Sequence, residues 1–236
     1  MIILGLDTSA AVCSVAIGRE DRVFTGISLD QGKTHSTQLM PTVEAALELS
    51  ELELKDLDYM AVTIGPGSFT GLRIGIAMVQ GLATALEKSV VPLSSLAVLA
   101  ERYRTWDAAV LALMDARHDR VYAALFDGDD CVIEDVLLPT EELAERIRGL
   151  DALPDHLILT GDGSEVLRQS EAFQALMQER GVRCFYSDVQ YPQASDAVIL
   201  AKRLLEQSPD SAMDPADLKP AYLTVTSAEK QLGIEV

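Results

Sequence analysis

The feature that most constrains the fold is an internal repeat of one local pattern. In each half of the chain an apolar run ends in aspartate, a short polar turn follows, and a second run of small and apolar residues begins. The two copies are Leu4–Asp7 with Val12–Ile17, and Ala112–Asp115 with Val121–Phe126. Repetition of this kind indicates a duplicated structural unit. We therefore expect two α/β lobes that share one fold.

Each expected lobe opens with a strand and a hairpin and continues with helices. We expect the first lobe to cover residues 1–107 and the second to cover residues 108–236. The strands are expected at residues 2–7, 12–18, 22–29 and 59–64, and at 109–115, 120–127, 131–138 and 156–160. The helices are expected at 35–49, 69–86 and 94–104, and at 141–148, 166–180 and 195–206. The fold class is therefore α/β with duplicated mixed-sheet halves.

The acidic balance of the chain limits its direct partners. There are 37 Asp and Glu residues against 19 Lys and Arg, a formal net charge of −18, which repels phosphate backbones. We therefore expect no nucleic-acid binding by this chain alone. The three cysteines are far apart and form no CxxC pair, so they indicate neither a disulfide framework nor a thiolate metal site. The start lacks a basic leader and a membrane-spanning apolar run, and we expect a cytoplasmic protein without membrane contact.

The aspartates that end the two repeated strands, Asp7 and Asp115, are the first candidates for chemistry. Duplicated lobes of this kind resemble the actin, hexokinase and Hsp70 superfamily, which implies a two-lobed actin-like fold with two such acids beside a nucleotide. Gly161 and Gly163 follow the strand at 156–160 and would add backbone contacts to phosphate in a vestigial nucleotide cleft. Neither aspartate is followed by a glycine turn. Acids that stabilise turns, and an ordinary β-to-α turn, remain the alternatives.

Other catalytic patterns are missing from the sequence. None of the three histidines has metal-binding spacing on an expected helix. The segment Gly65–Gly75 contains four glycines, but it lacks the lysine of a Walker phosphate loop and the arrangement of a nucleophile elbow. An anion site at the following helix start, formed by Ser68, Thr70 and Arg73, stays open as an alternative.

The expected helix at 69–86 has a wider apolar arc than a core-facing helix needs. One stripe faces the lobe's own sheet, and a neighbouring stripe contains Gly71, Gly75, Met78 and Leu82. Glycines in such a stripe allow another helix to approach closely. That helix is either the chain's own first helix or part of another chain. Arg73, in the first helical turn, indicates an anionic neighbour because the helix dipole disfavours a cation there.

Five segments taken together resemble the bacterial TsaB (YeaZ) family over nearly the whole chain. The most specific is Gly65–Gly75, with the sequence GPGSFTGLRIG. The supporting segments are Ile3–Ser9, Lys33–Ser36, Met114–Arg117 with Val121–Ala124, and Lys219–Leu223. The resemblance implies an actin-like, two-lobed fold and a non-catalytic role in making threonylcarbamoyladenosine on tRNA.

The resemblance also implies partners. TsaB proteins pair with TsaD, a homologous catalytic subunit that holds the metal, and an ATPase subunit, TsaE, docks on the pair. They also form homodimers through the same first-lobe helices. On this basis the chain has no cofactor of its own, a nucleotide binds only at a joint with partner subunits, and tRNA is contacted only through the complex. The implied interface residues are His35, Leu39, Met40, Val43, Gly71, Arg73, Gly75, Met78 and Leu82.

Two details refine this hypothesis. TsaD relatives carry a His-x-x-x-His pair on an early helix, whereas this chain offers only His35 there and resembles the degenerate partner. Thr224 stands where the family pattern has arginine after Tyr-Leu, which removes a basic contact from the tail. For this function, a bulky residue at Gly75 is expected to abolish pairing and leave the monomer folded.

Two other functions stay open on the sequence alone. One is a small-molecule kinase or phosphatase of the actin-like ATPase superfamily, with Asp7 and Asp115 in its cleft. The other is a degenerate metallopeptidase-like protein, which descends from the same superfamily.

Overall fold

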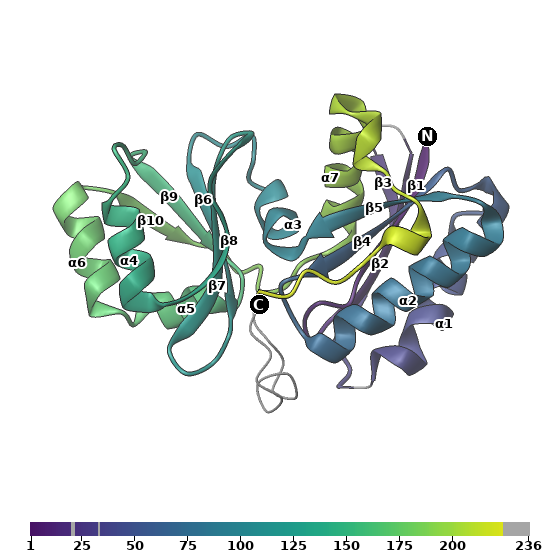
Figure 1. Cartoon of the computed structure of the whole chain (residues 1–236), viewed down its shortest axis with the longest axis horizontal. Helices are drawn as coiled ribbons and strands as arrows, with labels where there is room; N and C mark the ends of the chain where they lie inside the picture. The colour runs from purple at the N-terminus through teal and green to yellow at the C-terminus, as the bar shows by residue number, and fades with distance from the viewer. Residues whose placement is uncertain (20–21, 33, 224–236) are drawn as a thin grey trace. The chain divides into compact units, whose positions relative to one another are not determined.

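The computed structural model of the chain describes residues 1–19, 22–32 and 34–223. Contacts divide it into two compact units. The first contains residues 1–102 and 191–220, and the second contains residues 103–190 with the chain from residue 221. Each unit has its own five-stranded sheet (Figure 1). Thr224, which the sequence analysis singled out, lies outside the described residues.

The sheet of the first unit has the strand order β3-β2-β1-β4-β5. β1 (Ile2–Asp7), β2 (Cys13–Arg19) and β3 (Arg22–Leu29) form the expected antiparallel meander. β4 (Tyr59–Gly65) pairs with β1 in parallel, and β5 (Ser89–Ser94) pairs with β4 in parallel. β1 is therefore the central strand, and the turn that follows it lies at the carboxyl edge of the parallel part.

Helices cover both faces of this sheet. α1 (His35–Leu49) packs on β2 and β3, α2 (Phe69–Leu86) packs on β4, and the two helices contact each other. α7 (Ala194–Gln207) packs on β1 and β2 and covers the opposite face (Figure 1). At Gly5 of β1 a Cβ atom would lie only 2.7 Å from a methyl group of Val198. The missing side chain at Gly5 thus lets α7 lie close to the centre of the sheet.

The position of α7 differs from the lobe boundaries expected from the sequence, which left residues 108–236 in the second lobe. Apolar residues of α7 join those of β1, β2, β4 and β5 in one buried core. Between β5 and the second unit there is only the seven-residue helix α3 (Ser95–Glu101), which is too short to cover the face alone. The first sheet therefore takes its second layer from a segment that returns from the far end of the chain.

The chain after α7 stays with the first unit. Met213 forms an antiparallel bridge with Val90 of β5, and the Gln80 side chain in α2 donates hydrogen bonds to Pro215 O (3.1 Å) and Leu218 O (3.0 Å). This strap covers the free edge of β5. The short 3-10 helices of this unit are η1 (Leu54–Asp56), η2 (Pro209–Ser211) and η3 (Pro215–Asp217).

The second unit repeats the topology of the first. Its strands are β6 (Ala109–Asp115), β7 (Arg120–Asp127), β8 (Asp130–Pro139), β9 (His156–Thr160) and β10 (Arg183–Tyr186). Its helices are α4 (Thr140–Arg148), α5 (Gly163–Arg168) and α6 (Glu171–Arg180). The strand order β8-β7-β6-β9-β10 matches β3-β2-β1-β4-β5 position by position. The fold therefore contains the duplication that the repeated strand pattern predicted.

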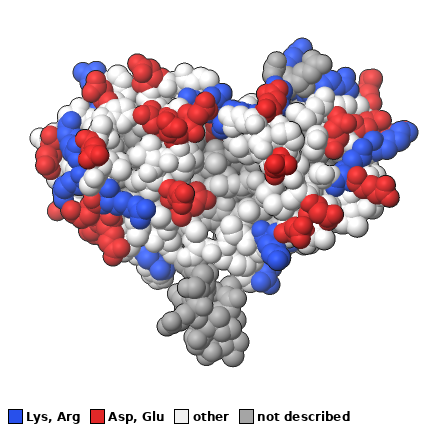
Figure 2. All heavy atoms as spheres, turned by 45° about the horizontal axis from the view of Figure 1, so that its top comes forward, with Lys and Arg blue, Asp and Glu red and all other residues white. Residues whose placement is uncertain are grey.

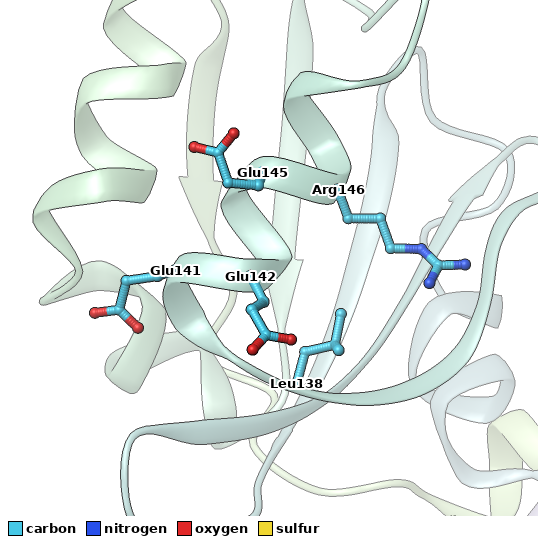
Figure 3. Close-up of a pocket in the computed structure, with 5 residues that line it drawn as sticks. All are labelled: Leu138, Glu141, Glu142, Glu145 and Arg146. Atoms are coloured by element: carbon cyan, nitrogen blue, oxygen red, sulfur yellow. The ribbon is translucent and has the colours of Figure 1, made fainter.

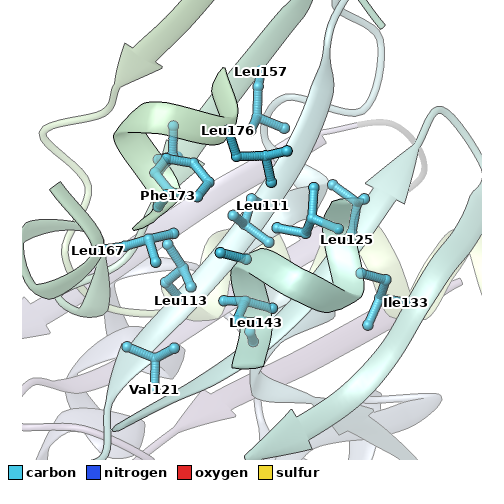
Figure 4. Close-up of a cluster of buried hydrophobic side chains, with 14 of the residues drawn as sticks. Leu111, Leu113, Val121, Leu125, Ile133, Leu143, Leu157, Leu167, Phe173 and Leu176 are labelled. Atoms are coloured by element: carbon cyan, nitrogen blue, oxygen red, sulfur yellow. The ribbon is translucent and has the colours of Figure 1, made fainter. Parts of the chain in front are cut away.

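The core of the second unit lies between its sheet and helices α4 to α6. Leu111 and Leu113 of β6 meet Leu143 of α4 and the fully buried ring of Phe173 from α6 (Figure 4). All buried members of this core come from residues 109–177. This core therefore contains no segment of the first unit.

Candidate protein-interaction site

Asp7, which ends β1, is completely buried. Its Oδ1 atom accepts hydrogen bonds from Ser9 Oγ (2.7 Å) and Thr63 Oγ1 (2.6 Å). Burial raises the pKa of Asp7 from 3.8 to about 6, although the hydrogen bonds from Thr63 and Ser9 and the nearby His35 lower it. These contacts fit the alternative in which Asp7 stabilises a turn within the fold.

The two glycines of the predicted partner stripe pack against this same turn. The Thr8 hydroxyl donates a hydrogen bond to Gly71 O (2.8 Å). A Cβ atom on Gly71 would overlap Thr8 O, and one on Gly75 would overlap Thr8 Oγ1. The close approach that these glycines permit is therefore to the chain's own β1 turn.

This geometry corrects four of the predicted partner contacts. Leu39 and Val43 of α1 are fully buried, and Gly71 and Gly75 of α2 are also buried within the chain. A second chain cannot reach these residues while the unit keeps this fold. The arc of apolar residues on α2 is as wide as the sequence indicated, and its two glycines face the β1 turn of the same chain.

The side of α2 that points away from the unit is apolar and lies beside the predicted stripe. We define the α2 outer face as Ile74, Ala77, Met78, Gly81, Leu82 and Ala85, all exposed or half-buried. Their spacing of three and four residues places them on one side of a helix. A Cβ atom on Gly81 would meet nothing within 4 Å. Met78 and Leu82 are the predicted contacts that belong to this face.

Charge is nearly absent from α2, because Arg73 is the one charged residue among its 18. By length and composition this helix would even be able to cross a membrane, although a third of it is buried in the chain. An exposed helix face of a soluble protein is normally charged or polar. The signal that would have located the outer face from sequence is the run of uncharged residues on the side opposite Leu72 and Val79.

The other predicted contacts lie near the start of the two helices. His35 is half-buried at the first residue of α1, where its Nε2 atom lies 2.9 Å from Ala10 O. Met40 is half-buried in the next turn of α1. Arg73 is exposed, and its guanidinium stacks 3.8 Å from the centre of the Phe69 ring. These positions leave Met40 and Arg73 accessible at the surface of the helical layer.

The anion site considered at the start of α2 would use Ser68, which already caps this helix. The Ser68 hydroxyl accepts a hydrogen bond from Gly71 N (3.2 Å) as the N-cap of α2. Ser68 N in turn donates to Ser9 O (2.7 Å). The hydroxyl and amide of Ser68 are thus already engaged by the chain itself.

In the second unit, the predicted cleft residues Asp115, Gly161 and Gly163 take part in backbone contacts of the fold. Asp115 is exposed, its backbone N–H donates to Asp162 Oδ1 (2.9 Å), and its Oδ1 accepts from Arg117 N (2.7 Å). A Cβ atom on Gly163 would lie 2.8 Å from the backbone of Met114. Gly163 therefore permits α5 to start close to β6. Gly161 is buried with a φ of 96°, a conformation that favours glycine.

Side chains that bind metal do not gather anywhere in the described part of the chain. No group of three or more His, Cys, Asp or Glu side chains converges among those residues. The pocket beside α4 is lined by Glu141, Glu142 and Glu145, but their carboxylates point in different directions (Figure 3). On the face shown in Figure 2, basic side chains lie among acidic ones and form no extended patch.

Comparisons with known proteins place these features in a family context. The family model of TsaD, tRNA N6-adenosine threonylcarbamoyltransferase, matches residues 29–232. A tRNA threonylcarbamoyladenosine biosynthesis protein TsaB from Escherichia coli is 31% identical over 98% of both chains. The structure of YeaZ from Pseudomonas aeruginosa superposes with a TM-score of 0.77 at 31% identity, covering 94% of this chain and 99% of that one. ROK hexokinase from Thermus thermophilus, at 12% identity, a TM-score of 0.54 and coverage of 88% and 100%, shares the fold.

Proposed function

The chain belongs to the TsaB (YeaZ) family, and from this premise we propose that it is a non-catalytic subunit that supports a TsaD-type enzyme in threonylcarbamoyl transfer to tRNA adenosine. The family resemblance of the sequence motifs is thus confirmed by identity over nearly the full length. The E. coli relative is named for the biosynthesis of tRNA threonylcarbamoyladenosine. Our proposal assigns this chain to the same process.

The observation that carries the proposal is the α2 outer face. It presents six uncharged residues at helical spacing, three of them exposed and three half-buried, in a protein whose net charge is −18. Monomeric proteins rarely leave such a strip open to water, and strips of this kind mark contacts with other proteins. A glycine in the middle of the strip, Gly81, leaves room for a close helix–helix contact.

The partner that best fits this face is a subunit with a similar first lobe. Residues 29–232 of this chain match the TsaD model, so a TsaD-type subunit offers a helical layer related to α1 and α2. Two related faces pack across a two-fold or pseudo-two-fold axis. The same geometry allows a homodimer when the TsaD-type subunit is absent. The two assemblies then compete for one surface.

The remaining proposals concern tRNA, the ATPase subunit and nucleotide binding. With 37 acidic residues against 19 basic ones, this chain repels a phosphate backbone, and we assign tRNA contact to the partner subunits. We propose that a TsaE-like ATPase docks on the assembled pair and that the chain works in the cytoplasm. We further propose that it needs no cofactor of its own and that a nucleotide binds only at a subunit joint.

A non-catalytic role is supported by what the candidate catalytic residues do in the fold. Asp7 is buried and accepts two short hydrogen bonds through one oxygen. Gly163 makes room for the β6 backbone. Calorimetry with ATP and Mg²⁺ tests this role: we expect no binding to the isolated chain. Binding that is lost in both Asp7→Asn and Asp115→Asn would instead favour a kinase or phosphatase.

The test of pairing with the TsaD-type subunit uses two glycines that both have room for a side chain. Gly81 in the α2 outer face and Gly26 in β3 are both exposed, and neither would bring a new Cβ atom within 4 Å of another group. We expect Gly81→Glu to weaken binding to the TsaD-type subunit at least tenfold, because it places a charge at the centre of an apolar contact. Gly26→Glu adds the same charge elsewhere and should leave affinity within twofold.

Affinity is measured by titration calorimetry and self-association by analytical ultracentrifugation. Circular dichroism and urea unfolding verify that both variants keep the folded monomer. Unchanged affinity of Gly81→Glu, both for the TsaD-type subunit and for a second copy, would remove the α2 outer face from the proposal.

A further inference from the structure

A groove lies between the edge strand β3 and helix α1. It encloses about 510 Å³, a volume typical of sites that bind ligands. Ile27 and Leu29 of β3 line one side, and Thr37, Pro41 and Ala45 of α1 line the other. These five residues are exposed or half-buried, and none of the described residues that line the groove is charged. A chain with a net charge of −18 thus keeps an uncharged groove open to solvent.

Hydrogen bonds between side chains join the two walls of the groove at its ends. The hydroxyl oxygens of Thr25 and Ser50, the C-cap residue of α1, lie 2.6 Å apart. At the other end Gln38 Nε2 donates to Gln31 Oε1 at 3.3 Å. Between these contacts β3 runs from Thr25 to Leu29, about 13 Å at the usual rise of a strand. The groove is therefore preformed and long enough for four or five residues of an extended chain.

The edge of β3 beside this groove lacks the usual protection against strand addition. A free edge presents unpaired N–H and C=O groups, and proteins normally protect it with charges, proline, bulges or a covering segment. From Thr25 to Leu29 the strand has neither a charged residue nor a proline, and its register with β2 is regular there. In the described part of the chain, β3 is the terminal strand of its sheet. Every second residue of this stretch therefore turns its backbone groups toward open space.

The other three sheet edges carry features that discourage strand addition. The strap covers the edge of β5 through the bridge between Val90 and Met213. β8 contains Glu134 and Asp135, and its pairing with β7 has two register shifts. β10 has only four residues, one of them charged. Among the described strands, β3 is thus the edge best suited to accept a further strand.

The rim of the groove is acidic on the α1 side. Glu44 and Glu48 are exposed, and their helical positions place them beside Pro41 and Ala45 on the side away from the sheet. Leu49, which is 71% exposed, lies one turn beyond Ala45. Carboxylates next to apolar groups favour a ligand that combines apolar side chains with Lys or Arg. A second copy of this chain paired through β3 would instead bring two more carboxylates to the same rim, which is unfavourable.

We propose that this groove binds an extended segment of another protein, which adds to β3 as a sixth strand of the first sheet. The backbone of the segment pairs with the free edge of β3. Successive side chains of a strand point to opposite faces, so alternate apolar side chains enter the groove, and a basic side chain next to them meets the acidic rim. Main-chain hydrogen bonds supply affinity in this binding mode, and the alternate side chains supply specificity.

This site is separate from the surface used in the proposed pairing with a TsaD-type subunit. In the first sheet, β2 and β1 lie between β3 and β4, and α2 packs on β4. Occupation of the groove therefore does not require loss of pairing through the α2 outer face. The inference adds a second protein contact to the first unit.

The experiment selects peptides on the full-length protein. Random ten-residue peptides displayed on phage are panned against the wild type, and each round is depleted on Ala45→Glu, which places a charge and extra bulk in the groove. We expect the retained peptides to have apolar residues at alternate positions and an excess of Lys and Arg. A selection that retains no peptide after depletion would overturn the proposal.

Titration calorimetry then measures the affinity of a retained peptide for matched variants. We expect Ala45→Glu to weaken binding at least tenfold. Ala175→Glu adds the same charge at an exposed position of α6 in the second unit and should leave affinity within twofold. Circular dichroism verifies that both variants are folded. The double variant Glu44→Gln with Glu48→Gln should bind a basic peptide about threefold more weakly. Equal losses in Ala45→Glu and Ala175→Glu would place the peptide outside the groove and overturn the proposal.

N-methylated peptides test the strand pairing without any change to the protein. A strand pairs with one neighbour through the N–H groups of alternate residues only. Methylation of one alternate set of peptide N–H groups should therefore weaken binding at least tenfold, and methylation of the other set should weaken it much less. Equal effects of the two sets would overturn the added strand.

Two further measurements separate the groove from other surfaces and occupants. Gly81→Glu, in the α2 outer face, should bind the peptide as tightly as the wild type does, and loss of binding in this variant would contradict the location. Analytical ultracentrifugation tests for a second copy in the groove. Self-association that Ala45→Glu abolishes and the peptide displaces would assign the groove to a second copy and overturn the proposal.

Discussion

The three glycines of α2 do not serve the same purpose. They differ in what lies next to the position where a side chain would begin. Gly71 and Gly75 face the β1 turn, where Thr8 occupies the space that a side chain would need. Gly81 faces open space, six residues further along the same helix. A helix interior disfavours glycine by about 1 kcal/mol relative to alanine. Gly71 and Gly75 are explained by the monomer, whereas Gly81 requires a different reason.

Alanine at these positions should therefore change stability in opposite directions. We predict that Gly71→Ala lowers the free energy of unfolding by about 2 kcal/mol or more, because the new methyl group overlaps the backbone oxygen of Thr8. Gly81→Ala should raise it by about 0.5 to 1 kcal/mol through helix propensity. Urea unfolding of the monomer measures both. Equal effects of the two substitutions would show that Gly71 is not constrained by the turn.

Sequence reasoning could find the glycine stripe but could not tell which neighbour filled it. Helical periodicity gives the width of the apolar arc on α2, and it does not reveal that the Thr8 turn reaches over Gly71 and Gly75. This contact joins residues more than 60 positions apart. For the same reason we now expect a bulky residue at Gly75 to destabilise the monomer as well, since a Cβ atom there would overlap Thr8 Oγ1.

Two ion pairs hold helix α7, one to Glu101 at the end of α3 and one to Arg102, the residue that follows it. Arg203 of α7 meets Glu101 of α3 with Nη2–Oε2 at 2.7 Å and Nε–Oε1 at 3.2 Å. Asp196, near the start of α7, accepts from Arg102 Nη2 at 2.9 Å. Burial raises the pKa of Asp196, and Arg102 offsets part of that effect. Because Glu101 is only 3% exposed, its pair is the more shielded of the two.

Removal of one partner from the shielded pair should be costly. We predict that Arg203→Met lowers the free energy of unfolding by about 2 to 4 kcal/mol, because the buried carboxylate of Glu101 loses its bidentate cation. Lys202→Met is the control on the same helix. Lys202 forms an ion pair with Glu206, whose carboxylate is exposed to solvent. The free energy of unfolding should therefore fall by less than about 1 kcal/mol.

Urea unfolding of both variants measures these changes. Glu101→Leu combined with Arg203→Met should recover part of the stability lost in Arg203→Met alone, since the uncompensated charge is gone. No recovery in the double variant would indicate that packing of the arginine stem, and not charge, accounts for the loss.

At the level of elements, the long periodic segments were predictable, whereas two short strands were missed. The α1 and α2 boundaries match the apolar periodicity, with α1 at His35–Leu49 and α2 at Phe69–Leu86. β5 was missed because its six residues include Pro92 and flank a helix start. β10 was missed because only four residues form it. The helix expected at 166–180 is interrupted where Ser170 begins a new cap by accepting from Phe173 N.

At the level of the whole molecule, the two units differ in how much of the chain each one needs. The second unit has its core within a continuous stretch of the chain. The first unit is discontinuous, because residues 191–220 supply α7 and the strap along β5. The strand repeat predicted two consecutive lobes, residues 1–107 and 108–236, but a pattern in β-strands carries no information about which sheet a distant helix covers.

This asymmetry leads to a test on fragments. We predict that residues 103–190 fold alone, with a cooperative urea transition and a dispersed NMR spectrum, because all buried members of the core between their sheet and helices lie within this stretch. Residues 1–102 alone should remain largely unfolded, because Ile3, Ala16 and Ala61 lose the helix that covers them.

A peptide of residues 191–220, added in trans, should restore the fold of residues 1–102, since it returns α7 and the strap without any other part of the second unit. Circular dichroism and NMR dispersion follow the recovery. In a control peptide, Val198→Asp places a charge where a methyl group of Val198 approaches the centre of the sheet at Gly5. This peptide should fail to restore the fold. Cooperative folding of residues 1–102 without any peptide would show that α7 is dispensable for the first unit.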